Sequence, residues 1–174
     1  EADATADSVL AQMDKCAETS WMMNMGSAKG DLIEKVIQQR RPKRLLEIGT
    51  FLGYMSIRLA RSMPVDAILT TVEIDDDNYA ASRRIRAKAL GKRDDSVIAL
   101  KANASEAIKS FKQPFDFVLM DHWKPVLTQR LFPNFSELQV RVDGVNATAR
   151  HRDAVDVALR ESTRLVREPR PCRD

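Results

Sequence analysis

Apolar residues follow two different patterns along the first 124 positions of the chain. Four short apolar runs, each stopped by glycine or polar residues, predict buried strands at 44–49, 68–74, 97–100 and 115–120. Apolar residues at helical spacing predict helices at 7–17, which Asp7 or Ser8 would cap, around 32–37, which Pro42 would end, and around 57–60. Three acids from Asp75 predict the start of another helix, and Gly91 its end.

Strands and helices therefore alternate with short links over residues 1–124. This alternation predicts an α/β fold with a doubly wound, mostly parallel sheet. Residues 125–174 differ in texture, because they hold nine Arg and no Lys. An alternating stretch at 138–142 permits a strand there, and 154–166 a polar helix. We expect residues 1–124 to form the core and residues 125–174 a divergent or irregular segment of the same domain.

Length, composition and charge exclude several classes of protein. The chain has 174 residues, of which 44% are hydrophobic and 30% charged, so it fits one globular domain. No apolar run approaches the roughly 20 residues that span a bilayer, and we expect no membrane segment and, by default, a cytoplasmic location. A segment before Glu1 would be invisible in this sequence. The net charge of +3 argues against a nucleic-acid partner.

A glycine-rich turn follows the first predicted strand. Glu47, Gly49 and Gly53 form an E-x-G-x-x-x-G pattern that leads into a helix, so its backbone can approach a ligand closely. Glu73 lies 24 residues after Gly49, at the end of the next predicted strand, where a carboxylate can bind both hydroxyls of a ribose. The spacing fits a nucleoside without a pyrophosphate, such as S-adenosylmethionine, better than a nicotinamide dinucleotide. The alternative is a pair of packing glycines with a solvated Glu.

An acidic residue also follows the fourth predicted strand. Asp121 should point into the same crevice as Gly49 and Glu73, because ligands bind at the carboxyl ends of strands in open α/β sheets. Its carboxylate suits Mg²⁺, and Lys124 lies near enough to act as a general base. The alternatives are that Asp121 caps a helix and that Lys124 is solvated. We give His122 no catalytic role.

Together these features resemble the catechol O-methyltransferases, a family of class I S-adenosylmethionine-dependent enzymes. The similarity runs from about Val9 to Lys124 and comprises Trp21-Met-Met-Asn-Met-Gly26, Lys29-Gly30, Leu45-Leu-Glu-Ile-Gly49, Gly53-Tyr54, Val72-Glu-Ile74, Ala104-Ser-Glu106 and Met120-Asp-His-Trp-Lys124. The resemblance implies the Rossmann-like fold of that class, a small-molecule catechol substrate and the cofactors S-adenosylmethionine and Mg²⁺. We expect the chain to act as a monomer.

The resemblance also implies a role for each matching residue. Asp121 would bind Mg²⁺, Lys124 would take the catechol proton, and Trp21 and Trp123 would form walls around the flat substrate. The residues expected to line the cofactor site are Met23, Asn24, Met25, Glu47, Gly49, Tyr54, Glu73, Ile74, Ser105, Glu106 and Asp121.

The chain departs from the family's pattern at several positions. The family has Gln in place of Glu106 and Ser in place of Met55, and here Ser56 comes one residue late. The family's remaining Mg²⁺ ligands are not recognisable, and Asp143 and Asn146 are the nearest substitutes. With a strand order of 3-2-1-4 and divergent C-terminal strands, the fourth strand would be an apolar edge. The chain is therefore either a Mg²⁺-dependent O-methyltransferase or an inactive remnant that binds S-adenosylmethionine with an incomplete metal site.

Overall fold

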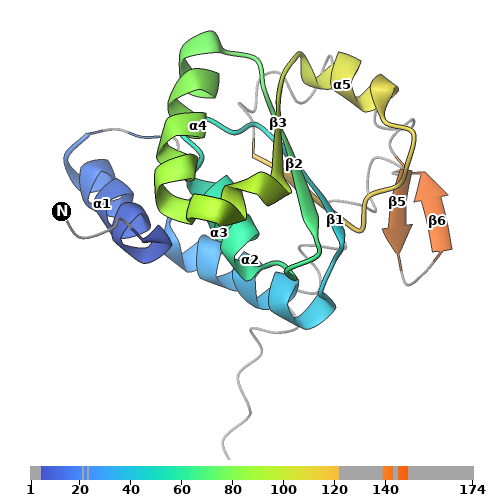
Figure 1. Cartoon of the computed structure of the whole chain (residues 1–174), viewed down its shortest axis with the longest axis horizontal. Helices are drawn as coiled ribbons and strands as arrows, with labels where there is room; N and C mark the ends of the chain where they lie inside the picture. The colour runs from blue at the N-terminus through green and yellow to red at the C-terminus, as the bar shows by residue number, and fades with distance from the viewer. Residues whose placement is uncertain (1–4, 21, 23, 122–138, 143–144, 149–174) are drawn as a thin grey trace, which may run out of the picture.

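A computed structural model of the chain describes residues 5–20, 22, 24–121, 139–142 and 145–148 (Figure 1). Its centre is a four-stranded sheet in the order β3-β2-β1-β4, and every pair of neighbouring strands is parallel. The strands are β1 (Arg44–Ile48), β2 (Ile68–Glu73), β3 (Val97–Lys101) and β4 (Phe117–Met120). The predicted α/β class and strand order are confirmed.

Helices cover both faces of this sheet. The helices are α1 (Ala6–Thr19), α2 (Ser27–Arg40), α3 (Tyr54–Ser62), α4 (Asp76–Leu90) and α5 (Ala104–Ser110), and a 3-10 turn, η1 (Gly91–Ser96), follows α4. Helices α2, α3 and α4 lie on one face, α5 lies on the other, and α1 packs outside α3 and α4 (Figure 1). The part of the chain that the structure describes contains no helix with the length and hydrophobicity that a membrane span requires.

Strand β1 is buried on both faces of the sheet, and this explains why its sequence is almost continuously apolar. Leu45 and Glu47 face α2 and α3, whereas Leu46 and Ile48 face α5, and all four are buried. A parallel strand covered on both faces needs apolar residues at nearly every position. Glu47 is the exception, and its burial indicates a specific role.

The first helix begins differently from the prediction. Thr5, not Asp7 or Ser8, is its N-cap: its Oγ1 accepts a hydrogen bond of 3.2 Å from the Ser8 amide, and Ser8 Oγ accepts one of 2.9 Å from the Thr5 amide. Asp7 forms an ion pair with Arg61 instead. The start of α4 is as predicted, since Asp75 Oδ1 accepts a hydrogen bond from the next turn.

Two short strands lie beyond the four-stranded sheet. β5 (Gln139–Val142) agrees with the strand predicted at 138–142, and it pairs antiparallel with β6 (Val145–Thr148), which the sequence analysis did not predict. The helix predicted at 154–166 falls outside the described residues.

Candidate active site

The sheet edge predicted to bind a ligand lies where the direction of strand addition reverses. From β1 the chain adds β2 and β3 on one side and then returns to add β4 on the other, which makes β1 and β4 a topological switch point. The Gly49 amide donates a hydrogen bond of 3.0 Å to the Val72 carbonyl, and the Asp121 amide one of 2.9 Å to the Ile48 carbonyl. The structure thus brings Gly49, Glu73 and Asp121 to the same edge of the sheet.

The turn after β1 has left-handed backbone at three positions. Gly49 and Gly53 have φ angles of 93° and 87°, which favour glycine, and Phe51 between them has a φ of 48°. A bulky residue in this conformation is strained, and such strain concentrates at functional sites. Phe51 was not predicted as a site residue, and the signal for it in the sequence is its position between the two glycines.

Glu73 connects this turn to the end of β2. One carboxylate oxygen accepts hydrogen bonds from the amides of Thr50 (3.2 Å) and Phe51 (2.7 Å), and the other from the amides of Ile74 and Asp75 (both 2.9 Å). Four donors occupy about all the acceptor positions of a carboxylate. Glu73 therefore lies where a ribose-binding residue was predicted, and it also holds the glycine turn against β2.

Glu47 is a fully buried carboxyl group behind the turn. Its Oε2 accepts hydrogen bonds from Ser56 and from Thr71 Oγ1, while its Oε1 has no partner among the described residues. Burial raises the pKa of Glu47 to about 7. The hydrogen bonds from Ser56 and Thr71 lower this pKa, but their effect is smaller than that of burial. The Ser56 hydroxyl, which comes one residue later than the serine in the family's pattern, therefore donates to Glu47.

The segment before α2 contains a buried polar side chain without a partner. Both Oδ1 and Nδ2 of Asn24 are buried and make no hydrogen bond with the described residues. Met25, the next residue, packs against the cluster that contains Tyr54 and Met55 of α3. A buried amide that lacks partners costs free energy unless a ligand or water supplies them, so Asn24 marks a candidate ligand contact.

Asp121 is a half-buried carboxyl group that follows β4. Burial raises the pKa of Asp121, and the positive charge of Lys29 on α2 opposes this shift. The sequence analysis gave Lys29 no role, although the Lys29-Gly30 pair lies within the stretch that resembles the family. No group of three or more His, Cys, Asp and Glu side chains that could hold a metal occurs among the residues whose placement is described. Among the described residues Asp121 is the carboxylate predicted to bind Mg²⁺, an ion that usually keeps several waters.

Three residues predicted to line the cofactor site, Ile74, Ser105 and Glu106, lie after the ends of β2 and β3. Ile74 follows β2 directly and is 61% exposed, which is unusual for isoleucine. Ser105 and Glu106 lie in the first turn of α5, where the Ser105 amide donates a hydrogen bond of 2.9 Å to Asn103 Oδ1. Glu106 is exposed, so its side chain is accessible to a ligand.

Several predicted site residues cannot be placed in this crevice. Tyr54 begins α3, but its hydroxyl accepts a hydrogen bond from Arg58 within the layer of helices. Asn146 lies in β6. The residues that fall outside the described part of the chain are Trp21, Met23, His122, Trp123, Lys124 and Asp143.

Comparison with known proteins agrees with the predicted family. A family model described as O-methyltransferase matches residues 1–141. Over 123 residues the chain is 38% identical to catechol O-methyltransferase of Mus musculus and 33% identical to catechol O-methyltransferase B of Danio rerio. Each alignment covers 67% of this chain and 46% of the relative, so the chain spans about half the length of these curated relatives.

Solved structures support the fold. The crystal structure of the O-methyltransferase TomG from Streptomyces achromogenes in complex with SAM superposes with a TM-score of 0.63 at 22% identity, covering 90% of this chain and 76% of that one. The predicted Rossmann-like fold of the class I methyltransferases is thus confirmed, as is the resemblance to catechol O-methyltransferases in sequence. The family model covers well over half of the chain, and the chain belongs to the O-methyltransferase family.

Proposed function

We propose that this chain binds S-adenosylmethionine and transfers its methyl group to a hydroxyl oxygen of a catechol, with Mg²⁺ at Asp121 and Lys124 as the general base. The observation that carries this proposal is the meeting of three strand ends at the switch point. Gly49 follows β1, Glu73 ends β2 and Asp121 follows β4. The glycine turn, the proposed ribose-binding carboxylate and the proposed Mg²⁺ ligand would therefore lie together at one edge of the sheet. Family membership supports the same reaction class.

The methyl donor would lie along the turn after β1. The Asn24 amide, which lacks partners among the described residues, supplies a donor and an acceptor for its methionine end. Glu73 would accept hydrogen bonds from the ribose hydroxyls. Its two carboxylate oxygens already accept from four backbone amides, so binding of the methyl donor would weaken one or more of those hydrogen bonds. Ile74, Ser105 and Glu106 would surround the adenine. Met23 and Met25 would flank the sulfonium end.

The catechol would lie between Asp121 and the donor's methyl group. Lys124 would take the proton from one catechol hydroxyl. That oxygen then forms a bond to the methyl carbon as the carbon–sulfur bond breaks, and the electron pair of that bond stays on sulfur as a neutral thioether. Bound at Asp121, Mg²⁺ would supply positive charge that orients both catechol oxygens and lowers the pKa of one. Trp21 and Trp123 would exclude water from the reacting atoms.

Catechol is favoured over other acceptors by the relatives and by one motif. The two curated relatives described above are named catechol O-methyltransferases. The sequence Met120-Asp-His-Trp-Lys124 places an aromatic ring between the predicted metal ligand and the predicted base. A flat, two-oxygen substrate fits such a combination of metal, ring and base.

The test combines cofactor binding with turnover on the full chain. Calorimetry measures binding of S-adenosylmethionine, and transfer of a labelled methyl group to a simple catechol is followed with Mg²⁺ and with EDTA. The proposal expects turnover that needs Mg²⁺ and that Lys124→Ala abolishes while cofactor binding is retained. Binding without turnover would instead support the inactive remnant with an incomplete metal site, and the absence of both would contradict the proposal.

A further inference from the structure

Two segments proposed to line the methyl-donor site are each followed at once by a helix. Residues 24–26 lead into α2, and the turn at 49–53 leads into α3. The way α2 packs on α3 therefore determines how far apart these two segments lie. Met25 packs against a hydrophobic cluster to which α3 contributes Tyr54, Met55 and Ile57, so the first segment and the start of α3 share one cluster.

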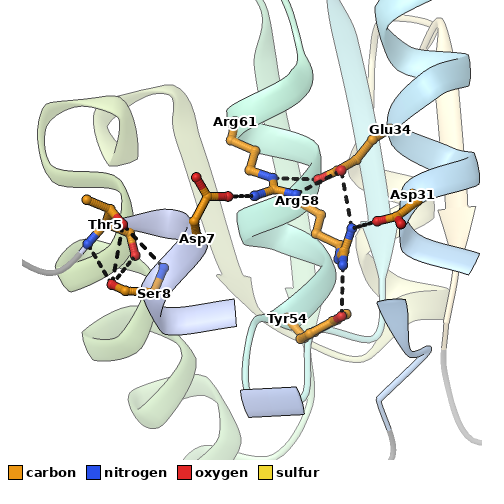
Figure 2. A network of polar contacts seen from close by, with 8 residues as sticks. All are labelled: Thr5, Asp7, Ser8, Asp31, Glu34, Tyr54, Arg58 and Arg61. Atoms are coloured by element: carbon orange, nitrogen blue, oxygen red, sulfur yellow. Dashed lines mark hydrogen bonds and ion pairs between the residues drawn. The ribbon is translucent and has the colours of Figure 1, made fainter. Parts of the chain in front are cut away.

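A single buried arginine joins the two helices. Arg58 of α3 donates hydrogen bonds to Asp31 Oδ1 (2.7 Å) and Glu34 Oε2 (3.2 Å), both on α2. It also donates to the Tyr54 hydroxyl (3.1 Å), and its guanidinium carbon lies 5.1 Å from the centre of the Tyr54 ring. The Arg58 side chain is only 4% exposed, and Figure 2 shows it between Asp31, Glu34 and Tyr54. Tyr54 is the first residue after the glycine turn, so the guanidinium connects α2 to the end of that turn.

The backbone of α2 approaches Arg58 very closely. A Cβ atom added to Gly30 would lie 2.5–2.7 Å from Nε, Cδ and Cζ of Arg58. Any other residue at position 30 would therefore force the Arg58 side chain to shift relative to its three partners. Gly30 and Arg58 thus form one unit, in which the missing side chain of the first makes room for the second.

A second arginine on the same helix provides a matched comparison. Arg61 donates to Glu34 at 2.6 and 2.9 Å and forms an ion pair with Asp7 of α1. Its side chain is 26% exposed, and neither Glu34 nor Asp7 adjoins the turn at 49–53, whereas Tyr54, a partner of Arg58, follows that turn directly. Figure 2 shows Arg61 between α1 and α2, one turn beyond Arg58. Through these contacts Arg61 joins α3 to α1 and α2 rather than to the glycine turn.

We infer that Arg58 is a positioning residue for the methyl-donor site, because it fixes residues 24–26 relative to the turn at 49–53 through α2 and Tyr54. This inference rests on the proposed binding of S-adenosylmethionine. Arg58 itself does not touch the donor. Loss of Arg58 lets α2 shift on α3, so the methyl donor must reorder both segments when it binds. The affinity for S-adenosylmethionine therefore falls, while the chemistry at the methyl group is unchanged.

The test compares Arg58→Lys with Arg61→Lys in the full chain. Lysine keeps the charge but cannot hold three partners in the planar geometry of a guanidinium. We expect Arg58→Lys to weaken calorimetric binding of S-adenosylmethionine about tenfold, which corresponds to roughly 1.4 kcal/mol, and Arg61→Lys to leave it within about twofold. Gly30→Ala should reproduce the loss. Where the protein turns over, KM for the donor rises in Arg58→Lys while kcat at saturation does not change.

A measurement without ligand separates this inference from the proposed function. Amide hydrogen exchange of the free proteins should be faster at 24–30 and 50–54 in Arg58→Lys but not in Arg61→Lys. Equal donor affinity in Arg58→Lys and the wild type, or an equal loss in both variants, would overturn the inference. If the wild type binds no S-adenosylmethionine, the proposed function fails, and unchanged exchange at both segments would overturn the positioning role as well.

Discussion

Thr71 Oγ1 donates a hydrogen bond of 2.5 Å to Oε2 of Glu47, directly across the β1–β2 pair at the centre of the sheet. Ser56 of α3 donates to the same oxygen, so two hydroxyls stabilise one buried carboxyl group. Arg86 of α4 contributes positive charge, and Asp121 negative charge, to the surroundings of Glu47. Desolvation exceeds the stabilising contributions, and the pKa of Glu47 is therefore raised from 4.5 to about 7.

This raised pKa makes stability depend on pH. Between pH 4.5 and about 7 the native protein binds a proton at Glu47 that the unfolded chain does not, so the free energy of unfolding falls as pH rises through this range. Replacing Glu47 by Gln removes this pH-dependent change in the free energy of unfolding. The change amounts to about 3 kcal/mol at most, at roughly 1.4 kcal/mol per unit of pKa. Urea denaturation at several pH values should show a shallower fall for Glu47→Gln. Exposed Glu18→Gln is the control, and an unchanged slope in Glu47→Gln would contradict the prediction.

Glu73 should matter for folding as well as for ligand binding. Glu73→Gln replaces one accepting oxygen by an NH₂ group that faces two backbone amide donors, so buried donors lose their acceptor. We expect the free energy of unfolding to fall by about 2 kcal/mol in chemical denaturation. Glu106→Gln makes the same chemical change at an exposed residue and should stay within about 0.5 kcal/mol of the wild type. Equal stabilities of the two variants would contradict this assignment.

Much of the fold could be predicted because its signals are local. The strands of a parallel sheet are buried on both faces, so short runs rich in aliphatic and β-branched residues, such as 45–48 and 69–72, are distinctive in sequence. The spacing of Gly49 and Gly53 predicted a turn after β1, and both glycines there have positive φ angles. In contrast, the start of α1 was misplaced, because three potential capping residues lie within four positions and only geometry selects Thr5.

The polar connections of the site could not be predicted, because they depend on packing. The dual role of Glu73 requires the turn at 49–53 to fold back onto the end of β2, and the sequence indicates only that the two are near. The role of Arg58 could not be predicted from the sequence, because its partners Asp31 and Glu34 lie 27 and 24 positions away on another helix. Interactions between helices carry no periodic signal in one sequence.

Arg93 should be important for stability far from the crevice. Its guanidinium donates hydrogen bonds of 2.7–2.9 Å to four backbone carbonyls around the end of α3, those of Ala60, Met63, Pro64 and Val65. Arg93→Ala leaves these carbonyls without a charged donor, and we expect it to lower the free energy of unfolding by roughly 3 kcal/mol. Thermal and urea denaturation would measure this loss. Exposed Lys92→Ala is the matched control, and a loss equal to the control's would contradict the prediction.

Asp121→Asn separates the two functional hypotheses at the metal. The amide keeps the size of the side chain and an oxygen ligand but removes the negative charge that would hold Mg²⁺. If Mg²⁺ acts at Asp121, turnover of a catechol should fall about 10³-fold, since a metal supplies several kcal/mol to the transition state. Calorimetric binding of S-adenosylmethionine should remain within about tenfold, because the residues proposed for its ribose and adenine are untouched.

The stability of the same variant provides an independent check. Burial raises the pKa of Asp121, so the folded state disfavours its charge, and the neutral Asp121→Asn variant should be at least as stable as the wild type above the normal pKa of an aspartate. Exposed Asp95→Asn is the control for both measurements. A variant that turns over at the wild-type rate would remove Asp121 from the metal site. Asp121 is also among the residues predicted to line the cofactor site, so a variant that binds no donor would show that donor binding requires Asp121. Its loss of turnover would then follow from the empty donor site rather than from Mg²⁺.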